Sequence, residues 1–221
     1  MVGLGACLLL WGFLALASEV MEGDTTTLDT RILVSLRKAD DLSKPIGPAW
    51  VESVLLDLTA LGGMTVLGLV VLAVAGFLML QTRYRTAVAV LITAASAEIA
   101  NIAIKSMFMR PRPTVVPHLR EVVSTSFPSG HAMDSAIIYL TLGAMLMRLT
   151  DSRVTKLYCI GMAIVLTLLV GVSCVYLGVH YPTDVIGGWI FGFLWALVCW
   201  LVSERFEART GVTRERKQAA K

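Results

Sequence analysis

The stretch of sequence that decides the fold is LYCIGMAIVLTLLVGVSCVYL, residues 157–177. It carries no charged side chain and is long enough to cross the ~30 Å hydrocarbon core of a bilayer as a helix. A second stretch of the same kind, VIGGWIFGFLWALVCWLV, occupies residues 185–202. Because backbone N–H and C=O groups meet no water in lipid, both stretches must form helices that satisfy these groups internally.

The same pattern extends through the rest of the chain. Of its 221 residues 56% are hydrophobic, and the mean hydropathy of +0.74 excludes an ordinary soluble domain. The first apolar block lacks the positive start and the cleavage site of a signal peptide, so we predict a retained helix there. We predict an all-α fold, one integral-membrane domain over residues 1–221, built as a six-helix transmembrane bundle with short extracytoplasmic helices. The four further apolar blocks lie at residues 4–20, 64–80, 87–104 and 132–149.

The placement of Lys and Arg predicts the orientation of the bundle. Positive residues concentrate on the cytoplasmic side of a membrane, here in the connection at Arg83 and in a basic tail, residues 203–221. This puts both termini in the cytoplasm and the loop of residues 21–63 outside. Within that loop we predict short helices at residues 31–38 and 48–61. The second helix suits either the membrane interface or a lid on the bundle.

Polar residues gather at the helix ends that this orientation places outside. Lys105 comes directly after the helix predicted at residues 87–104, and Arg112 follows between two prolines that stiffen the backbone. Lys binds phosphate as a point charge and Arg as a fork. Directly before the next span, Ser129 and Gly130 begin a turn whose N–H groups can form an anion nest. Together these groups can cradle a phosphoryl group.

Two histidines and a carboxylate supply the other groups that hydrolysis of a phosphate ester needs. His180 follows the fifth span, and Asp184 opens the sixth. An imidazole can attack phosphorus when a carboxylate holds its other nitrogen, and Asp184 suits that role as well as a helix cap. His131, at the start of the fourth span, is placed to protonate the leaving oxygen.

These stretches resemble the type 2 phosphatidic acid phosphatase superfamily, whose pattern is K-x6-R-P, then P-S-G-H, then S-R-x5-H-x3-D. The resemblance implies a metal-independent reaction in two steps. His180 would form a phosphohistidine while Asp184 orients it, and His131 would act as the acid. The phosphoryl oxygens would be held by Lys105, Arg112, Ser129 and Gly130. The pattern is matched at the right spacing by Lys105, Arg112 and Pro113, by residues 128–131, and by Ser173, His180 and Asp184.

One position departs from the family pattern, because Cys174 stands where the pattern has an arginine. A thiol cannot replace a guanidinium, and a lost charged hydrogen bond is worth ~1.5–3 kcal/mol, roughly 10- to 150-fold in rate. Arg110 and Arg120, from the neighbouring loop, are candidates to fill the gap. Further auxiliary candidates are Ser173, Cys174 itself and His118, the last for structure or for headgroup contact.

From these observations we expect a lipid phosphatase of a bacterial cytoplasmic (inner) membrane, with its site facing the periplasm or cell exterior. Undecaprenyl pyrophosphate is the leading substrate class, followed by phosphatidylglycerol phosphate and phosphatidic acid. The alternatives are a lipid-phosphate binder or transporter weakened in catalysis by Cys174, and vanadate-dependent peroxidase chemistry, which shares the motif. The four cysteines lie in apolar blocks without zinc spacing. We predict no metal, no cofactor and no nucleic-acid partner.

Overall fold

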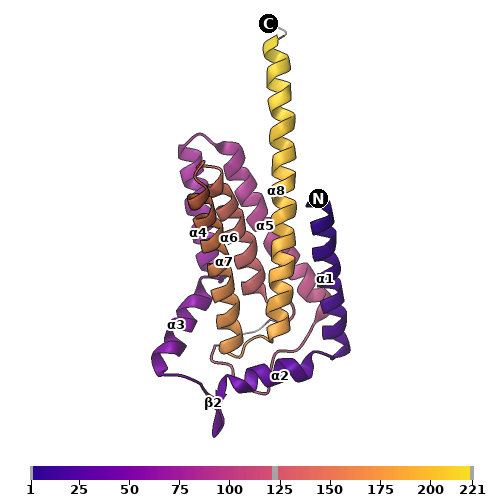
Figure 1. Cartoon of the computed structure of the whole chain (residues 1–221), viewed down its shortest axis with the longest axis vertical. Coiled ribbons are helices and arrows are strands. Elements are labelled where there is room, and N and C mark those ends of the chain that lie inside the picture. Colours follow the sequence, from indigo (N-terminus) through magenta and orange to yellow (C-terminus); the bar gives the residue numbers. More distant parts are fainter. Residues whose placement is uncertain (1, 121–123, 220–221) are drawn as a thin grey trace.

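The protein is predominantly helical. The computed structural model describes residues 2–120 and 124–219, and these residues form eight helices and one two-stranded antiparallel hairpin (Figure 1). In chain order the elements are α1 Val2–Glu22, α2 Thr26–Ser35, β1 Arg37–Lys38, β2 Asp41–Pro45, α3 Ala49–Ala60, α4 Met64–Leu80, α5 Tyr84–Phe108, α6 Gly130–Met147, α7 Arg153–Tyr176 and α8 Pro182–Ala219.

The long helices run side by side, and the short elements gather at one end of the bundle. Figure 1 shows α2, the hairpin and α3 at the end where α5 and α7 finish and where α6 and α8 begin. The N-terminus of α1 and the C-terminal end of α8 lie towards the opposite end. Because the three polar motifs sit at these helix ends, the fold brings all of them to one end of the bundle.

The core is built around α6, which packs against both α7 and α8. Met133 and Ile137 of α6 are completely buried. Lipid is as apolar as this core, so the packing stabilises the bundle through close van der Waals contact rather than through removal from water. The outer helices turn large apolar side chains outward, as Trp11 and Leu157 do, and this forms the surface that lipid requires.

The predicted count of six spans is not confirmed. Four of the described helices, α1, α5, α7 and α8, are long and apolar enough to cross a membrane. A fifth span results if α3 and α4 are treated as one span that bends by 50°. The helix α4 covers only 17 residues by itself. The first turns of α6 carry His131 and Asp134 at the end where the motifs meet, and these residues lower its hydropathy.

The loop of residues 21–63 also differs from its prediction. The helix predicted at residues 31–38 is α2, which begins and ends earlier, and the hairpin follows it. The Asp41 side chain favours a turn here, because it accepts hydrogen bonds from the backbone N–H of Ser43 at 3.0 Å and from its hydroxyl at 2.6 Å. The helix predicted at residues 48–61 is α3, which is one residue shorter at each end.

The hairpin is fastened to the end of α7 by bonds in both directions. The buried Arg37 donates from NH1 to the carbonyl of Tyr176 at 2.9 Å. The hydroxyl of Tyr176 donates to the carbonyl of Ile46, beyond β2, at 2.6 Å. Tyr176 lies four residues before His180. The loop therefore braces the segment that carries the predicted nucleophile.

The predicted basic tail, residues 203–221, continues α8 as far as Ala219, and residues 220 and 221 lie outside the described residues. A helix rises ~1.5 Å per residue, whereas the hydrocarbon core of a bilayer is only ~30 Å thick. The 38 residues of α8 therefore exceed the length of one membrane crossing.

Candidate active site

The turn between α7 and α8 presents His180. Gly178 has a positive φ of 74°, which glycine adopts without strain and which ends α7. The N–H of Val179 then closes back on the carbonyl of Cys174 at 3.2 Å. Pro182 is the first residue of α8, a position where the missing N–H costs nothing. Gly178 therefore ends α7 and Pro182 begins α8, and His180 lies in the buried turn between the two helices.

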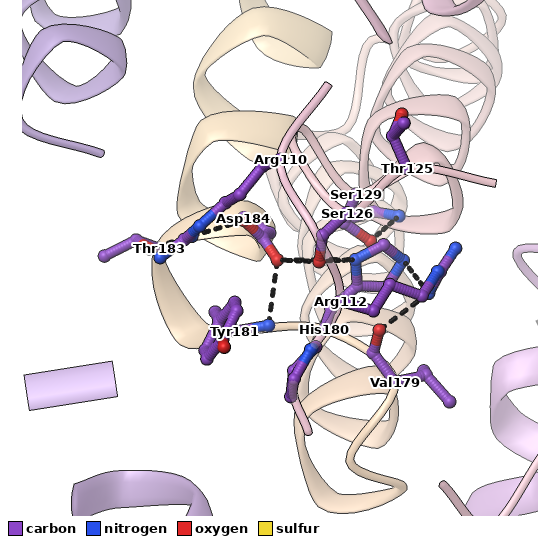
Figure 2. Close-up of polar contacts among 12 residues, drawn as sticks. Arg110, Arg112, Thr125, Ser126, Ser129, Val179, His180, Tyr181, Thr183 and Asp184 are labelled. Atoms are coloured by element: carbon purple, nitrogen blue, oxygen red, sulfur yellow. Dashed lines mark hydrogen bonds and ion pairs between the residues drawn. The ribbon is translucent and has the colours of Figure 1, made fainter. Parts of the chain in front are cut away.

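The imidazole of His180 lies between a carboxylate and a guanidinium (Figure 2). Its Nδ1 is 3.6 Å from Oδ2 of Asp184 and 3.5 Å from the hydroxyl of Ser126, which donates to the same Oδ2 at 2.5 Å. Its Nε2 is 3.3 Å from NH1 of Arg112. The carboxylate favours a proton on Nδ1, which leaves the Nε2 lone pair facing Arg112. Burial lowers the pKa of His180 to about 4, so the ring is neutral at pH 7.

The buried carboxylate of Asp184 is held through both oxygens. Oδ1 accepts from NH1 of Arg110 at 2.6 Å, and Oδ2 accepts from the backbone N–H of Tyr181 at 2.9 Å. Arg110 also donates from NH2 to Asp29 of α2 at 2.9 Å, and Asp29 is completely buried. Burial disfavours the charged guanidinium, but Asp184 and Asp29 outweigh it and raise the pKa of Arg110. Arg110 thus bridges two carboxylates.

The two cations of the first motif converge on Ser124. Lys105 Nζ lies 3.2 Å from both the Ser124 hydroxyl and the Thr125 carbonyl. Arg112 donates from Nε to the Ser124 carbonyl at 2.6 Å and from NH2 to its hydroxyl at 3.0 Å. NH1 of Arg112 donates to the Val179 carbonyl at 2.6 Å, next to His180. Arg112 therefore lies on the side of His180 that the Nε2 lone pair faces, and Lys105 shares Ser124 with Arg112.

The second motif forms the start of α6. The hydroxyl of Ser129 caps the helix by accepting from the N–H of Ala132 at 3.5 Å. The N–H of Ser129 donates to the carbonyl of Asp184 at 2.9 Å, which ties the second motif to the third. Gly130 permits a close approach, because a Cβ there would lie 2.8 Å from Nδ2 of Asn101. With the Ser129 N–H already bonded, the backbone donors for an anion are those of the next positions in the helix.

His131 faces the same group of charges. Its Nε2 is 2.9 Å from NH1 of Arg120, and the charges of Arg120, Lys105 and Arg112 act on its ring. The structure thus gathers two imidazoles, several cations and a helix N-terminus at one end of the bundle. Such an arrangement can stabilise the charge that develops during phosphoryl transfer.

The remaining auxiliary candidates contact their own surroundings. Ser173 donates its hydroxyl to a carbonyl one turn earlier in α7, at 2.7 Å. His118 is exposed, and its Nε2 lies 2.6 Å from the carbonyl of Pro113 in the same loop. Cys174 is buried, with its Sγ 3.4 Å from the hydroxyl of Thr59 on α3.

Several residues of the site were not predicted from the sequence. Ser126 lies two residues before Pro128, and this closeness to the second motif could have singled it out. Asp29 bonds to Arg110 and Thr183, which are 81 and 154 positions away in the chain, so no local pattern marks it. Ser124 and Thr183 were also missed.

Known proteins are similar to this chain in sequence. The model of the PAP2 superfamily matches residues 86–208. Phosphatidylglycerophosphatase B of Bacillus subtilis (strain 168) is 34% identical over 148 residues, covering 66% of this chain and 71% of that protein. Undecaprenyl-diphosphatase of Sulfolobus acidocaldarius is 34% identical over 92 residues, which cover 42% of this chain and 36% of that protein.

Solved structures share the architecture. The crystal structure of the first transmembrane PAP2 type phosphatidylglycerolphosphate phosphatase from Bacillus subtilis matches with a TM-score of 0.81 and 28% identity, covering 90% of this chain and 96% of that one. LpxE of Aquifex aeolicus matches with a TM-score of 0.54 and 22% identity over 72% of this chain and 88% of its own, a likeness of fold alone. With its apolar helices and these relatives, the chain is an integral membrane protein that belongs to the PAP2 superfamily.

Proposed function

We propose that the protein is a lipid phosphatase that hydrolyses a membrane lipid phosphate or pyrophosphate through a phosphohistidine at His180, without a metal ion. The observation that carries this proposal is the setting of the imidazole. Nδ1 lies beside Asp184 and Ser126, and Nε2 lies beside Arg112. This setting suits an imidazole nucleophile, with one nitrogen held by an acceptor and the other turned to an anion-binding cluster.

In the first step, Nε2 of His180 attacks phosphorus, and the P–N bond forms while the bond to the leaving oxygen breaks. The proton on Nδ1 stays with the ring, and the negative Asp184 stabilises the positive charge that the ring acquires. Lys105 and Arg112, with N–H groups at the start of α6, hold the phosphoryl oxygens. His131 gives its proton to the leaving oxygen.

In the second step, water attacks the phosphohistidine. His131, which lost its proton in the first step, now accepts one from the water, and phosphate leaves as the P–N bond breaks. His180 returns to its neutral form with the proton still on Nδ1. The cations contact the phosphoryl group in both steps, so each one contributes twice in a single turnover.

The substrates to examine first follow from the setting and from the relatives. A site at the end of a membrane bundle favours a phosphate carried by a lipid. The named relatives point to phosphatidylglycerol phosphate and undecaprenyl pyrophosphate. The distribution of Lys and Arg supports a site on the outer face of a bacterial cytoplasmic membrane.

The test is phosphate release by the purified protein in detergent, with EDTA present. The panel contains undecaprenyl pyrophosphate, phosphatidylglycerol phosphate and phosphatidic acid. The native protein should release phosphate from at least one of them, and His180→Ala should release none while still binding the lipid. More than a few per cent of native activity in His180→Ala would exclude the phosphohistidine. Binding without release by the native protein would identify a binder, and a strict metal requirement would exclude the metal-independent reaction.

A further inference from the structure

The third motif lacks its arginine, and the structure shows what takes up its position. Cys174 is only 1% exposed, and its Sγ lies 3.4 Å from the hydroxyl of Thr59. A neutral thiol packed against α3 offers no charged donor to a phosphoryl oxygen. The charge and the fork that the family pattern places here must therefore come from elsewhere if phosphate is to be bound as strongly.

Arg120 brings a guanidinium to this place from a different segment. It lies in the connection between α5 and α6, and its NH1 is 2.9 Å from Nε2 of His131. Its charge also acts on the Cys174 thiol and on Arg112. The head group of Arg120 thus reaches the region that the general acid, the motif cation and the substituted position share.

The contacts of Arg120 are those of an anion-binding cation rather than of a structural one. Arg110 illustrates the structural kind, because it is paired with two buried carboxylates. Within residues 2–120 and 124–205, no carboxylate lies within ion-pair distance of Arg120, which instead donates to His131 and whose charge acts on the neighbouring Arg112. Burial, with a smaller contribution from the Arg120 charge, lowers the pKa of Arg112. Like charges held together in this way repel, and a bound anion relieves that repulsion.

The bond between Arg120 and His131 also implies movement. Nε2 of His131 accepts from Arg120 in this structure, yet the general acid of the first step is an imidazolium, which carries a proton on both ring nitrogens. Both cannot hold at once, because a protonated Nε2 has no lone pair to accept with. Arg120 must therefore leave His131 when the substrate binds, and a phosphoryl oxygen is the neighbouring acceptor with the greatest charge.

We propose that Arg120 supplies the phosphate-binding guanidinium that Cys174 cannot, replacing the motif arginine from another segment of the chain. The proposal rests on the phosphatase function proposed above. The guanidinium rests on His131 before substrate binds and contacts a phosphoryl oxygen afterwards. The loss at position 174 is in this way compensated by a residue 54 positions earlier in the sequence.

The test compares Arg120→Ala with Arg31→Ala, which removes an exposed arginine of α2 near the same end of the bundle. Arg120→Ala should lower kcat/KM by about 10- to 150-fold, the cost of one charged hydrogen bond. It should also raise the inhibition constant of inorganic phosphate by a similar factor, and Arg31→Ala should change neither. Arg120→Lys keeps the charge without the fork and should fall between the two.

A rescue experiment separates phosphate binding from a role in holding His131. In the native background, Cys174→Arg should leave activity level or lower it, because the new cation meets Arg120. In Arg120→Ala it should restore at least part of the lost activity. If Cys174→Arg disturbs folding, the phosphate inhibition constants of Arg120→Ala and Arg120→Lys decide instead.

Two results would overturn the proposal while leaving the phosphatase function intact. In the first, Arg120→Ala behaves like Arg31→Ala. In the second, Arg120→Ala changes the pH profile of turnover but leaves phosphate inhibition untouched, as expected of a residue that only holds His131. Failure of the function itself looks different, because the native protein would then release no phosphate from any lipid.

Discussion

Asp29 provides the sharpest test of how the site is held together, because it lies outside all three motifs. It is completely buried on α2 and accepts three hydrogen bonds: from Arg110 NH2 at 2.9 Å, from the N–H of Thr183 at 3.1 Å and from its hydroxyl at 2.6 Å. Asp29→Ala removes every one of these acceptors. It leaves the guanidinium of Arg110, itself 8% exposed, with Asp184 as its one remaining carboxylate partner of the two described.

The expected loss is large because the pair is buried. Removing one partner of a buried ion pair costs about 3–5 kcal/mol. For a chain of this size 1 kcal/mol corresponds to ~2–4 °C in melting temperature, so Tm in detergent should fall by at least about 6 °C. Turnover should fall as well, with kcat affected more than KM. Arg110 keeps its bond to Asp184 but loses its anchor on Asp29, so it holds the carboxylate less rigidly beside His180.

The control is Asp24→Ala, which removes an exposed carboxylate a few residues earlier. Asp29→Asn keeps the shape and an acceptor but not the charge, and should lie between Asp29→Ala and the native protein. Equal Tm and kcat in Asp29→Ala and Asp24→Ala would refute the reasoning. A lower Tm with an unchanged specific activity of the folded protein would show that Asp29 stabilises α2 without orienting Asp184.

Two further predictions concern protons and sidedness. Because burial lowers the pKa of His180 to about 4, and attack needs the neutral ring, the acidic limb of kcat/KM should lie near pH 4. An alkaline limb should follow where His131 loses the proton that it gives to the leaving oxygen. An acidic limb near the ordinary histidine value of about 6.5 would contradict this. In a background without native cysteines, Thr114→Cys should react with a membrane-impermeant thiol reagent in intact spheroplasts, and Asp151→Cys only after lysis. The reverse labelling would invert the orientation and put the site on the cytoplasmic leaflet.

The sequence predicted those parts of the fold that local signals control. The helices expected at residues 87–104 and 157–177 are α5, which extends past the expected range at both ends, and α7, which begins four residues and ends one residue earlier than expected. Both helices end shortly before a residue that favours a break, Pro111 after α5 and Gly178, with its positive φ of 74°, after α7. The number of spans was not predictable in this way. It depends on whether α3 and α4 act together across a 50° bend, which packing decides rather than composition.

The same distinction separates the parts of the site. His180, Asp184 and Arg112 were recognisable because their spacing along the chain is fixed by the turns that hold them. The role of Arg110 was not recognisable, because its two carboxylate partners are far away in the sequence. Asp29, on α2, lies 81 positions before it, and Asp184, at the start of α8, lies 74 positions after it. Spacing alone could not tell Arg110 from Arg120 as the substitute cation. The contacts separate them, since one faces carboxylates and the other faces His131.

The two hydrogen bonds that join the hairpin region to the end of α7, which we call the clasp, limit which segments can be swapped between related proteins in a chimera. Arg37 lies before residue 86, where the match to the superfamily begins, yet it holds the end of the helix that leads into His180. A chimera joined at residue 86 would inherit every motif residue and still lose this clasp. A chimera of two related proteins should therefore be active only when the hairpin and the end of α7 come from the same parent. The segment that has to be exchanged as a whole is longer than the segment that contains the motifs.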